Sequence, residues 1–124
     1  MKKTLLIFVL ILGLIFIGSA KIGAKMNSEI SQVKASHILV NTQDEASALK
    51  TKINNNEITF EDAAKQFSKC PSGQNGGDLG YFGKGMMVKP FENAAFSAET
   101  NKVTEPIQTQ FGWHLIKVTD KKIN

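Results

Sequence analysis

The stretch that decides the fold reads Cys70-Pro-Ser-Gly-Gln-Asn-Gly-Gly-Asp-Leu-Gly-Tyr-Phe-Gly-Lys-Gly-Met-Met-Val-Lys-Pro-Phe91. Its glycines allow repeated sharp bends of the backbone, at Gly73, Gly76, Gly77, Gly80, Gly83 and Gly85. Large apolar side chains lie between and after them, at Leu79, Tyr81, Phe82, Met86, Met87 and Phe91. A solvated linker does not carry so much apolar surface. The pattern therefore predicts a loop that folds apolar side chains around a hollow.

Two histidine motifs flank this loop in the sequence. His37 lies in Ala-Ser-His-Ile-Leu-Val, and His114 lies in Thr-Gln-Phe-Gly-Trp-His-Leu-Ile-Lys-Val. Together with the glycine loop, and in the same order, these motifs resemble the parvulin family of peptidyl-prolyl cis/trans isomerases. The resemblance extends from Val33 to Val118.

Apolar periodicity predicts the element order β-α-α-β-α-β-β, with helices packed on a four-stranded, mainly antiparallel sheet. The first strand places Ala35, His37 and Leu39 on one face, because side chains alternate along a strand. This α+β arrangement is also what the resemblance implies, the parvulin-like form of the FKBP-like superfold. The strands are expected over residues 33–40, 79–82, 105–109 and 113–119.

Capping residues and apolar spacing place the three expected helices. Thr42 and Glu45 form a capping box before the first helix, which ends at residues 54–56. Thr59 begins the second helix, over residues 60–68, and Pro90 lies in the first turn of the third, which runs to Ser97. The first two helices are expected to bury Ala46, Leu49, Ile53, Phe60, Ala63, Ala64 and Phe67.

The positive charge of the chain is concentrated at its N-terminus. The formal net charge is +4, and Lys2, Lys3, Lys21 and Lys25 account for all of it. The sequence contains no arginine, so bidentate phosphate contacts are not available. We therefore expect no nucleic-acid binding.

The first residues have the layout of a targeting segment. Residues 5–17 are apolar apart from Gly13, follow two lysines and precede Gly18-Ser19-Ala20. Cleavage as a signal peptide and retention as a membrane-anchoring helix both remain open, because about 17–25 apolar residues span a bilayer. Both predict export, with the protein either anchored to the membrane or released into the envelope. The expected parts are a targeting segment (residues 1–25), a tether (26–32), a parvulin-type domain (33–120) and a tail (121–124).

The resemblance implies a proline pocket made by Leu79, Met87 and Phe91, with Phe111 at its rim. Met87 and Phe91 are four residues apart and share a face where the third helix begins. A flexible thioether beside an aromatic ring suits a pocket that accepts proline in several poses. Taken without the resemblance, the same residues also fit an ordinary core.

His37 and His114 match the paired histidines of the family, on neighbouring central strands. At least one imidazole should be neutral, because two charged rings close together repel one another. The resemblance implies that Thr109 hydrogen-bonds within their network, although a purely structural histidine pair remains open. Cys70 matches a position where parvulins carry Cys or Asp, which favours an electrostatic or packing role over nucleophilic attack.

These features predict a peptidyl-prolyl isomerase, an enzyme of the isomerase class, that acts on X-Pro bonds of unfolded or nascent exported polypeptides without a cofactor or metal. Parvulins that prefer phosphorylated substrates carry a long basic loop between the first strand and the first helix. The matching connection here is only Asn41-Thr42 and has no Lys or Arg, so the resemblance implies no such preference. One alternative is a chaperone that holds Pro-containing unfolded chains with little turnover. Another is a metal or redox site built from Cys70, His37 and His114, although the chain has no metal-ligand spacing.

Overall fold

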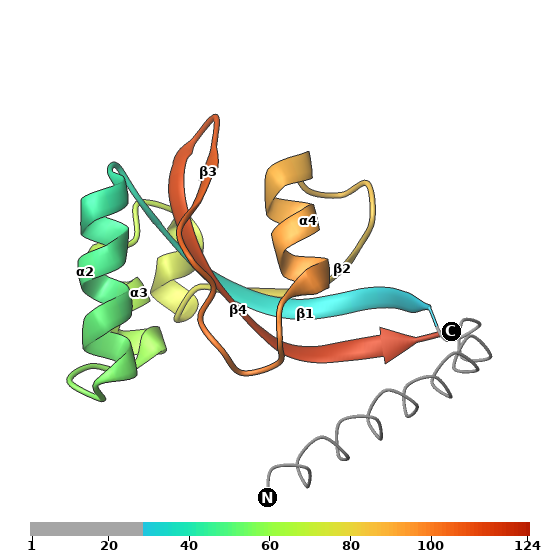
Figure 1. Ribbon diagram of the computed structural model, residues 1–124, viewed down its shortest axis with the longest axis horizontal. Helices are drawn as coiled ribbons and strands as arrows, with labels where there is room; N and C mark the ends of the chain where they lie inside the picture. Colours follow the sequence, from blue (N-terminus) through green and yellow to red (C-terminus); the bar gives the residue numbers. More distant parts are fainter. Residues whose placement is uncertain (1–28) are drawn as a thin grey trace, which may run out of the picture.

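The computed structural model describes residues 29–124, which form a four-stranded antiparallel sheet in the order β2-β1-β4-β3 (Figure 1). This confirms the α+β fold and the order of elements, to which a short 3₁₀ helix, η2, is added within the glycine loop. The predicted apolar N-terminal helix lies outside the described residues. The elements are β1 (Ile30–Val40), α2 (Gln43–Asn54), α3 (Phe60–Phe67), η2 (Pro71–Asn75), β2 (Asp78–Gly83), α4 (Lys89–Ser97), β3 (Ile107–Thr109) and β4 (Gly112–Ile123).

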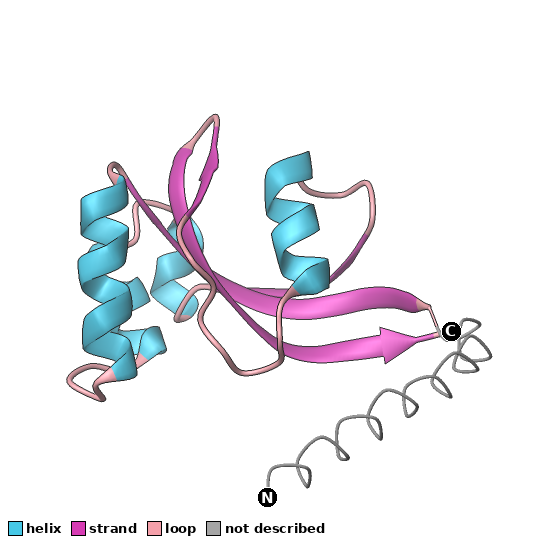
Figure 2. Cartoon of the chain, in the orientation of Figure 1, coloured by secondary structure: helices cyan, strands magenta, loops and turns pink. Residues whose placement is uncertain are grey.

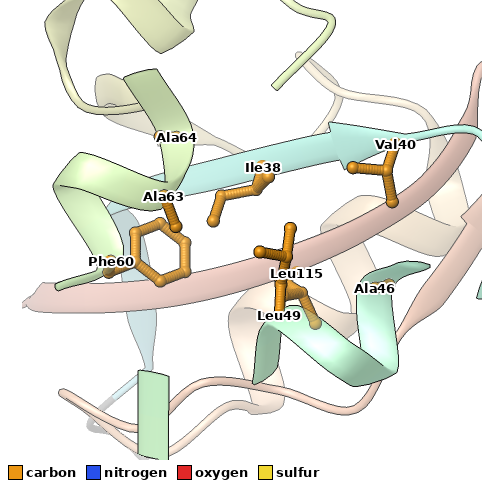
Figure 3. Close-up of a cluster of buried hydrophobic side chains, with 8 residues drawn as sticks. All are labelled: Ile38, Val40, Ala46, Leu49, Phe60, Ala63, Ala64 and Leu115. Carbon is orange, nitrogen blue, oxygen red and sulfur yellow. The ribbon is translucent and has the colours of Figure 1, made fainter. Parts of the chain in front are cut away.

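The central strands β1 and β4 are covered on both faces, with α2 and α3 on one side and α4 on the other (Figure 2). Neighbouring residues of a strand therefore serve different cores, because their side chains point to opposite faces. Ile38, Val40 and Leu115 pack against α2 and α3 (Figure 3). On the opposite face, α4 covers Val33, Ala35, Ile116 and Val118.

The helices begin at the residues that the capping patterns predict. The N–H of Glu45 donates to Thr42 Oγ1 at 3.1 Å, and Glu45 Oε1 accepts from the N–H of Thr42 at 3.2 Å, which confirms the capping box. Thr59 Oγ1 accepts from the N–H of Asp62 at 3.0 Å and so caps α3.

Within residues 29–124, no helix has the length and apolar character needed to cross a membrane.

Of the predicted core residues, Ile53 is only partly buried, and Phe67 is exposed. The expectation that Phe67 lies in the core is wrong, since 46 % of it is exposed. Phe67 is the last residue of α3, and Ser68 after it is already extended, with φ −69° and ψ 136°. Its side chain therefore extends beyond the end of the core that Phe60, Ala63 and Ala64 complete.

The two central strands are longer than predicted. β1 begins at Ile30 rather than Val33, and β4 continues to Ile123. Each extension is paired with the other, with Ile30 opposite Ile123. Local sequence gives no apolar alternation there, so residues 30–32 of the predicted tether and residues 121–123 of the predicted tail are strand instead.

The glycine loop lies directly against β1. The N–H of His37 donates to the carbonyl of Gly77 at 2.9 Å. Gly77 has a φ of +86°, and a Cβ placed on it would stand 2.3 Å from the carbonyl oxygen of His37. Asp78 Oδ1 accepts from the N–H of Gly80 at 2.9 Å, as expected of a residue that anchors this loop. The loop therefore reaches His37 only because position 77 has no side chain.

We expect Gly77→Ala to lower the free energy of unfolding by about 3 kcal/mol or more, because it adds a backbone clash to the cost of a positive φ. Gly80→Ala is the matched control, since its φ is +71° but nothing lies within 4 Å of the added Cβ. That variant should lose only about 1 kcal/mol. Denaturant unfolding measures both, and equal losses would contradict the close approach.

Candidate active site

The two histidines meet on the face of the sheet that α4 covers. His37 lies on β1 and His114 on β4, and the residues are 5 % and 4 % exposed. Their Nδ1 atoms are 3.1 Å apart and share a hydrogen bond. The predicted proximity of the two rings on neighbouring central strands is therefore confirmed.

A hydroxyl group lies at each end of this imidazole pair. His37 Nε2 is 3.2 Å from Ser72 Oγ, and His114 Nε2 is 2.7 Å from Thr109 Oγ1. Thr109 Oγ1 also accepts from the N–H of Phe111 at 3.1 Å. A neutral imidazole has one donor and one acceptor, so all hydrogen bonds along the chain from Thr109 to Ser72 run in the same direction.

Burial keeps both rings neutral. Desolvation, and then repulsion from His114, lowers the pKa of His37 from 6.5 to about 4. Desolvation also lowers the pKa of His114. The expectation that at least one ring is neutral therefore holds for both at neutral pH.

An apolar cavity of about 550 Å³ opens beside the histidine pair. The ring of Phe91 stands edge-on to both imidazoles, with centroids 5.4 Å from His37 and 5.2 Å from His114. Every residue predicted for the proline pocket lines this cavity, namely Leu79, Met87, Phe91 and Phe111. Cys70, His37 and His114 line it as well, whereas Thr109 is not among its lining residues and reaches the site through His114.

The hydroxyl partner of His37 comes from η2. Among residues 29–124 the thiol of Cys70 makes no hydrogen bond, and Ser72 is the partner of His37. Ser72 is not among the site residues that the sequence predicts. The sequence feature that points to Ser72 is its position two residues after Cys70, in a glycine-rich turn. Further lining residues that the sequence analysis missed are Leu39, Lys69, Pro71, Met86 and Val88.

A buried carboxylate fastens the loop that carries the two methionines. Glu92 is 3 % exposed, and its Oε1 accepts from the N–H of Gly85 at 2.7 Å. Lys89 Nζ lies 3.3 Å from the other carboxylate oxygen. The hydrogen bond from Gly85 and the charge of Lys89 lower the pKa of Glu92, so this carboxylate stays ionised and holds the loop before Met86 to α4.

No group of three His, Cys, Asp or Glu side chains within residues 29–124 is arranged to hold a metal ion. In particular, Cys70 does not join the two histidines in such a group.

The fold and the paired histidines beside an apolar cavity define a parvulin-type peptidyl-prolyl isomerase domain. Residues 20–122 match the family described as the PPIC-type PPIASE domain, and the chain belongs to this family. A foldase protein PrsA from a Geobacillus species is 49 % identical over 92 residues, covering 73 % of this chain and 33 % of that protein. The chain thus spans about a third of the length of the curated relatives it matches.

Two solved structures are similar to the chain. The crystal structure of a peptidylprolyl isomerase, PrsA from Bacillus anthracis, has a TM-score of 0.72 and 42 % identity, covering 75 % of this chain and 43 % of that one. The solution structure of NmPin, the parvulin of Nitrosopumilus maritimus, has a TM-score of 0.66 and 46 % identity. It covers 73 % of this chain and 97 % of that one, so the same domain makes up almost all of NmPin.

We expect the free energy of unfolding to fall as the pH is lowered from 6.5 to about 4. In this window the unfolded chain binds a proton on His37 that the folded chain does not, because the folded pKa is the lower one. The contribution of neutral His37 to the free energy of unfolding is complete above its unfolded pKa of 6.5 and is lost as the pH falls towards its folded pKa of about 4. The full shift corresponds to on the order of 3 kcal/mol.

Denaturant unfolding across this pH range measures the effect. His37→Gln provides the control, since it removes the titrating group while keeping a polar side chain. Above about pH 5, where most carboxyl groups stay ionised, this variant should show a much smaller slope. An unchanged slope would contradict a neutral, buried His37.

Proposed function

We propose that this domain is a peptidyl-prolyl cis/trans isomerase that accelerates X-Pro isomerisation in unfolded polypeptides. The observation that carries the proposal is the apolar cavity of about 550 Å³ bounded by a neutral, hydrogen-bonded imidazole pair. A pocket of this kind accepts a pyrrolidine ring and the adjoining amide while excluding water. Membership of the isomerase family supports the same reaction.

The reaction needs rotation about one bond and no change in covalent bonding. Partial double-bond character gives the peptide bond a rotational barrier of about 18–20 kcal/mol. Water raises the barrier by hydrogen-bonding the carbonyl oxygen, which favours the planar, charge-separated form. A site that grips the ring, removes this water and fits the twisted amide better than either planar isomer lowers the barrier.

In this proposal Leu79, Met87 and Phe91 hold the proline ring, and Phe111 covers it from the rim. Because the hydrogen bonds through His37 and His114 run in one common direction, they give one wall of the cavity a net dipole. No proton has to be transferred. Cys70 packs against the substrate amide, and neither a metal nor a cofactor takes part.

The cellular setting is a proposal from the N-terminal sequence and the relatives. Residues 1–25 have the layout of a signal or anchoring segment, which supports a location outside the cytoplasm, either membrane-anchored or free in the envelope. Relatives named foldase support unfolded chains as substrates. Exported chains expose apolar surface while they wait for slow X-Pro exchange, so a catalyst of this step is useful there.

We expect Met87→Ala to lower kcat/KM for a Pro-containing tetrapeptide by tenfold or more, which corresponds to about 1.4 kcal/mol of transition-state binding. Met87 is partly buried and lines the cavity, so its truncation should leave the fold intact. Phe91→Ala is less informative, because Phe91 is 3 % exposed and its loss is expected to cost about 3–5 kcal/mol of stability. A protease-coupled assay measures the rates.

Ile123→Ala is the matched control, since Ile123 is 54 % exposed at the end of β4 and does not line the cavity. Its rate should equal that of the unaltered chain. If Met87→Ala also keeps the full rate, the proposal fails. Peptide binding without turnover would then favour the alternative of a chaperone that holds unfolded chains, for which the exposed Met86 and Phe111 provide a surface.

A phospho-Ser-Pro peptide should be turned over no more than about fivefold faster than its unphosphorylated form, since one exposed ion pair contributes at most about 1 kcal/mol. β1 and α2 are joined only by Asn41 and Thr42, which carry no cation. Lys69 is the one charged side chain that lines the cavity among the described residues, and an ammonium group cannot form a bidentate clamp. A much larger preference for the phosphopeptide in exchange spectroscopy would overturn this expectation.

A further inference from the structure

The exposed aromatic ring at the end of α3 borders a second cavity. This α2–α3 groove has a volume of about 410 Å³ and is lined chiefly by Val40, Ala48, Leu49, Lys52, Phe67 and Lys69. Its volume lies within the range of ligand-binding pockets, about 300–1,000 Å³. Val40 and Leu49 belong to the core beneath it, so its floor is rigid and apolar (Figure 3).

The groove adjoins the proposed active site. Lys69 lines both cavities. Its backbone N–H donates to the carbonyl of Leu39 at 2.8 Å, which fixes it beside the end of β1. Leu39 lines the active-site cavity, and Val40, the next residue, lines the groove. The boundary between the two cavities is therefore a single strand edge.

The charges of the groove favour one kind of occupant. Glu45 lines it, but its carboxylate already accepts from the backbone N–H groups of Asn41 and Thr42. Lys52 and Lys69 form no ion pair with another residue in the described range. Lys52 and Lys69 outnumber Glu45, so the net charge around the apolar floor is positive, which suits an apolar side chain next to an acidic one.

We infer that the α2–α3 groove is a second binding subsite for the substrate polypeptide. While the proline occupies the active-site cavity, an extended segment of the same chain crosses the strand edge at Lys69 and places a large apolar side chain against Phe67. This inference rests on the proposed function and deepens it. The substrate class becomes an extended chain with a proline and, several residues away, an apolar side chain. Such a sequence is buried in a folded protein and exposed in an unfolded one.

The test uses the full chain and peptides with one proline in a Gly/Ser background. A single Leu is placed about two to eight residues from the proline on either flank, since an extended residue spans about 3.3 Å. At one spacing, the Leu peptide should show a KM about tenfold below that of its Leu→Ser counterpart, as expected for burial of one apolar side chain. An Asp beside that Leu should lower KM further at low salt. Exchange spectroscopy gives the rates without a protease.

Phe67→Ala should abolish the advantage of the Leu peptide while leaving kcat/KM for a short tetrapeptide unchanged. Ala48→Gln is a second variant that keeps the helix propensity of α2 and fills the groove, and it should act in the same way. Ile123→Ala, an exposed apolar truncation elsewhere, should change neither substrate. If no spacing gives an advantage, or if Phe67→Ala slows both substrates equally, the inference is overturned.

The dissociation constants of the same peptides separate this inference from the proposed function. If no peptide is turned over but the Leu advantage in binding depends on Phe67, the groove is confirmed and the isomerase proposal fails. If all peptides are turned over without such an advantage, the isomerase proposal stands alone. If the chain associates with itself in a Phe67-dependent way, the groove binds a second copy instead. If the Leu advantage emerges only when residues 1–28 are removed, the groove binds that segment instead.

Discussion

The hydrogen bond between two neutral imidazoles is the constraint on which the rest of the structure depends. Nδ1 atoms 3.1 Å apart require that β1 and β4 be neighbours in one register. Burial lowers the pKa of both rings, and α4 contributes to this burial by placing Phe91 against them. The glycine loop completes the enclosure by docking its backbone on His37. Each surrounding element can thus be understood by what it does for this pair.

Stability and site chemistry are divided between the two faces of the central strands. The α2–α3 face is filled by a contiguous apolar cluster, with no buried polar side chain from residues 29–124. The α4 face combines a second apolar cluster with the imidazole network and a cavity. Side chains line this cavity without filling it, and hydrogen bonds such as that from Gly85 to Glu92 hold the loops of this face in place. Changes in the first core should therefore alter stability more than chemistry.

Much of this structure is predictable because its signals are local. The capping box at Thr42 and the alternation around His37 each act within a few residues of sequence. What could not be predicted depends on partners far along the chain. Ile30 becomes strand because Ile123 lies opposite, and Ser72 joins the network because η2 turns it towards His37. The spacing of Phe67 fits a buried helix face, but the helix ends there, so periodicity alone gives the wrong environment.

The meeting of the two strand ends sets how the domain responds to force. The N–H of Asn124 donates to the carbonyl of Glu29 at 3.0 Å, and β1 and β4 run antiparallel from that point (Figure 1). Tension applied through these two residues would break the hydrogen bonds between β1 and β4 one after another, instead of loading all of them together in shear. The domain should therefore begin to open at low force, starting where Glu29 and Asn124 meet. The imidazole pair would separate only after the strand pairs nearest to these residues had opened.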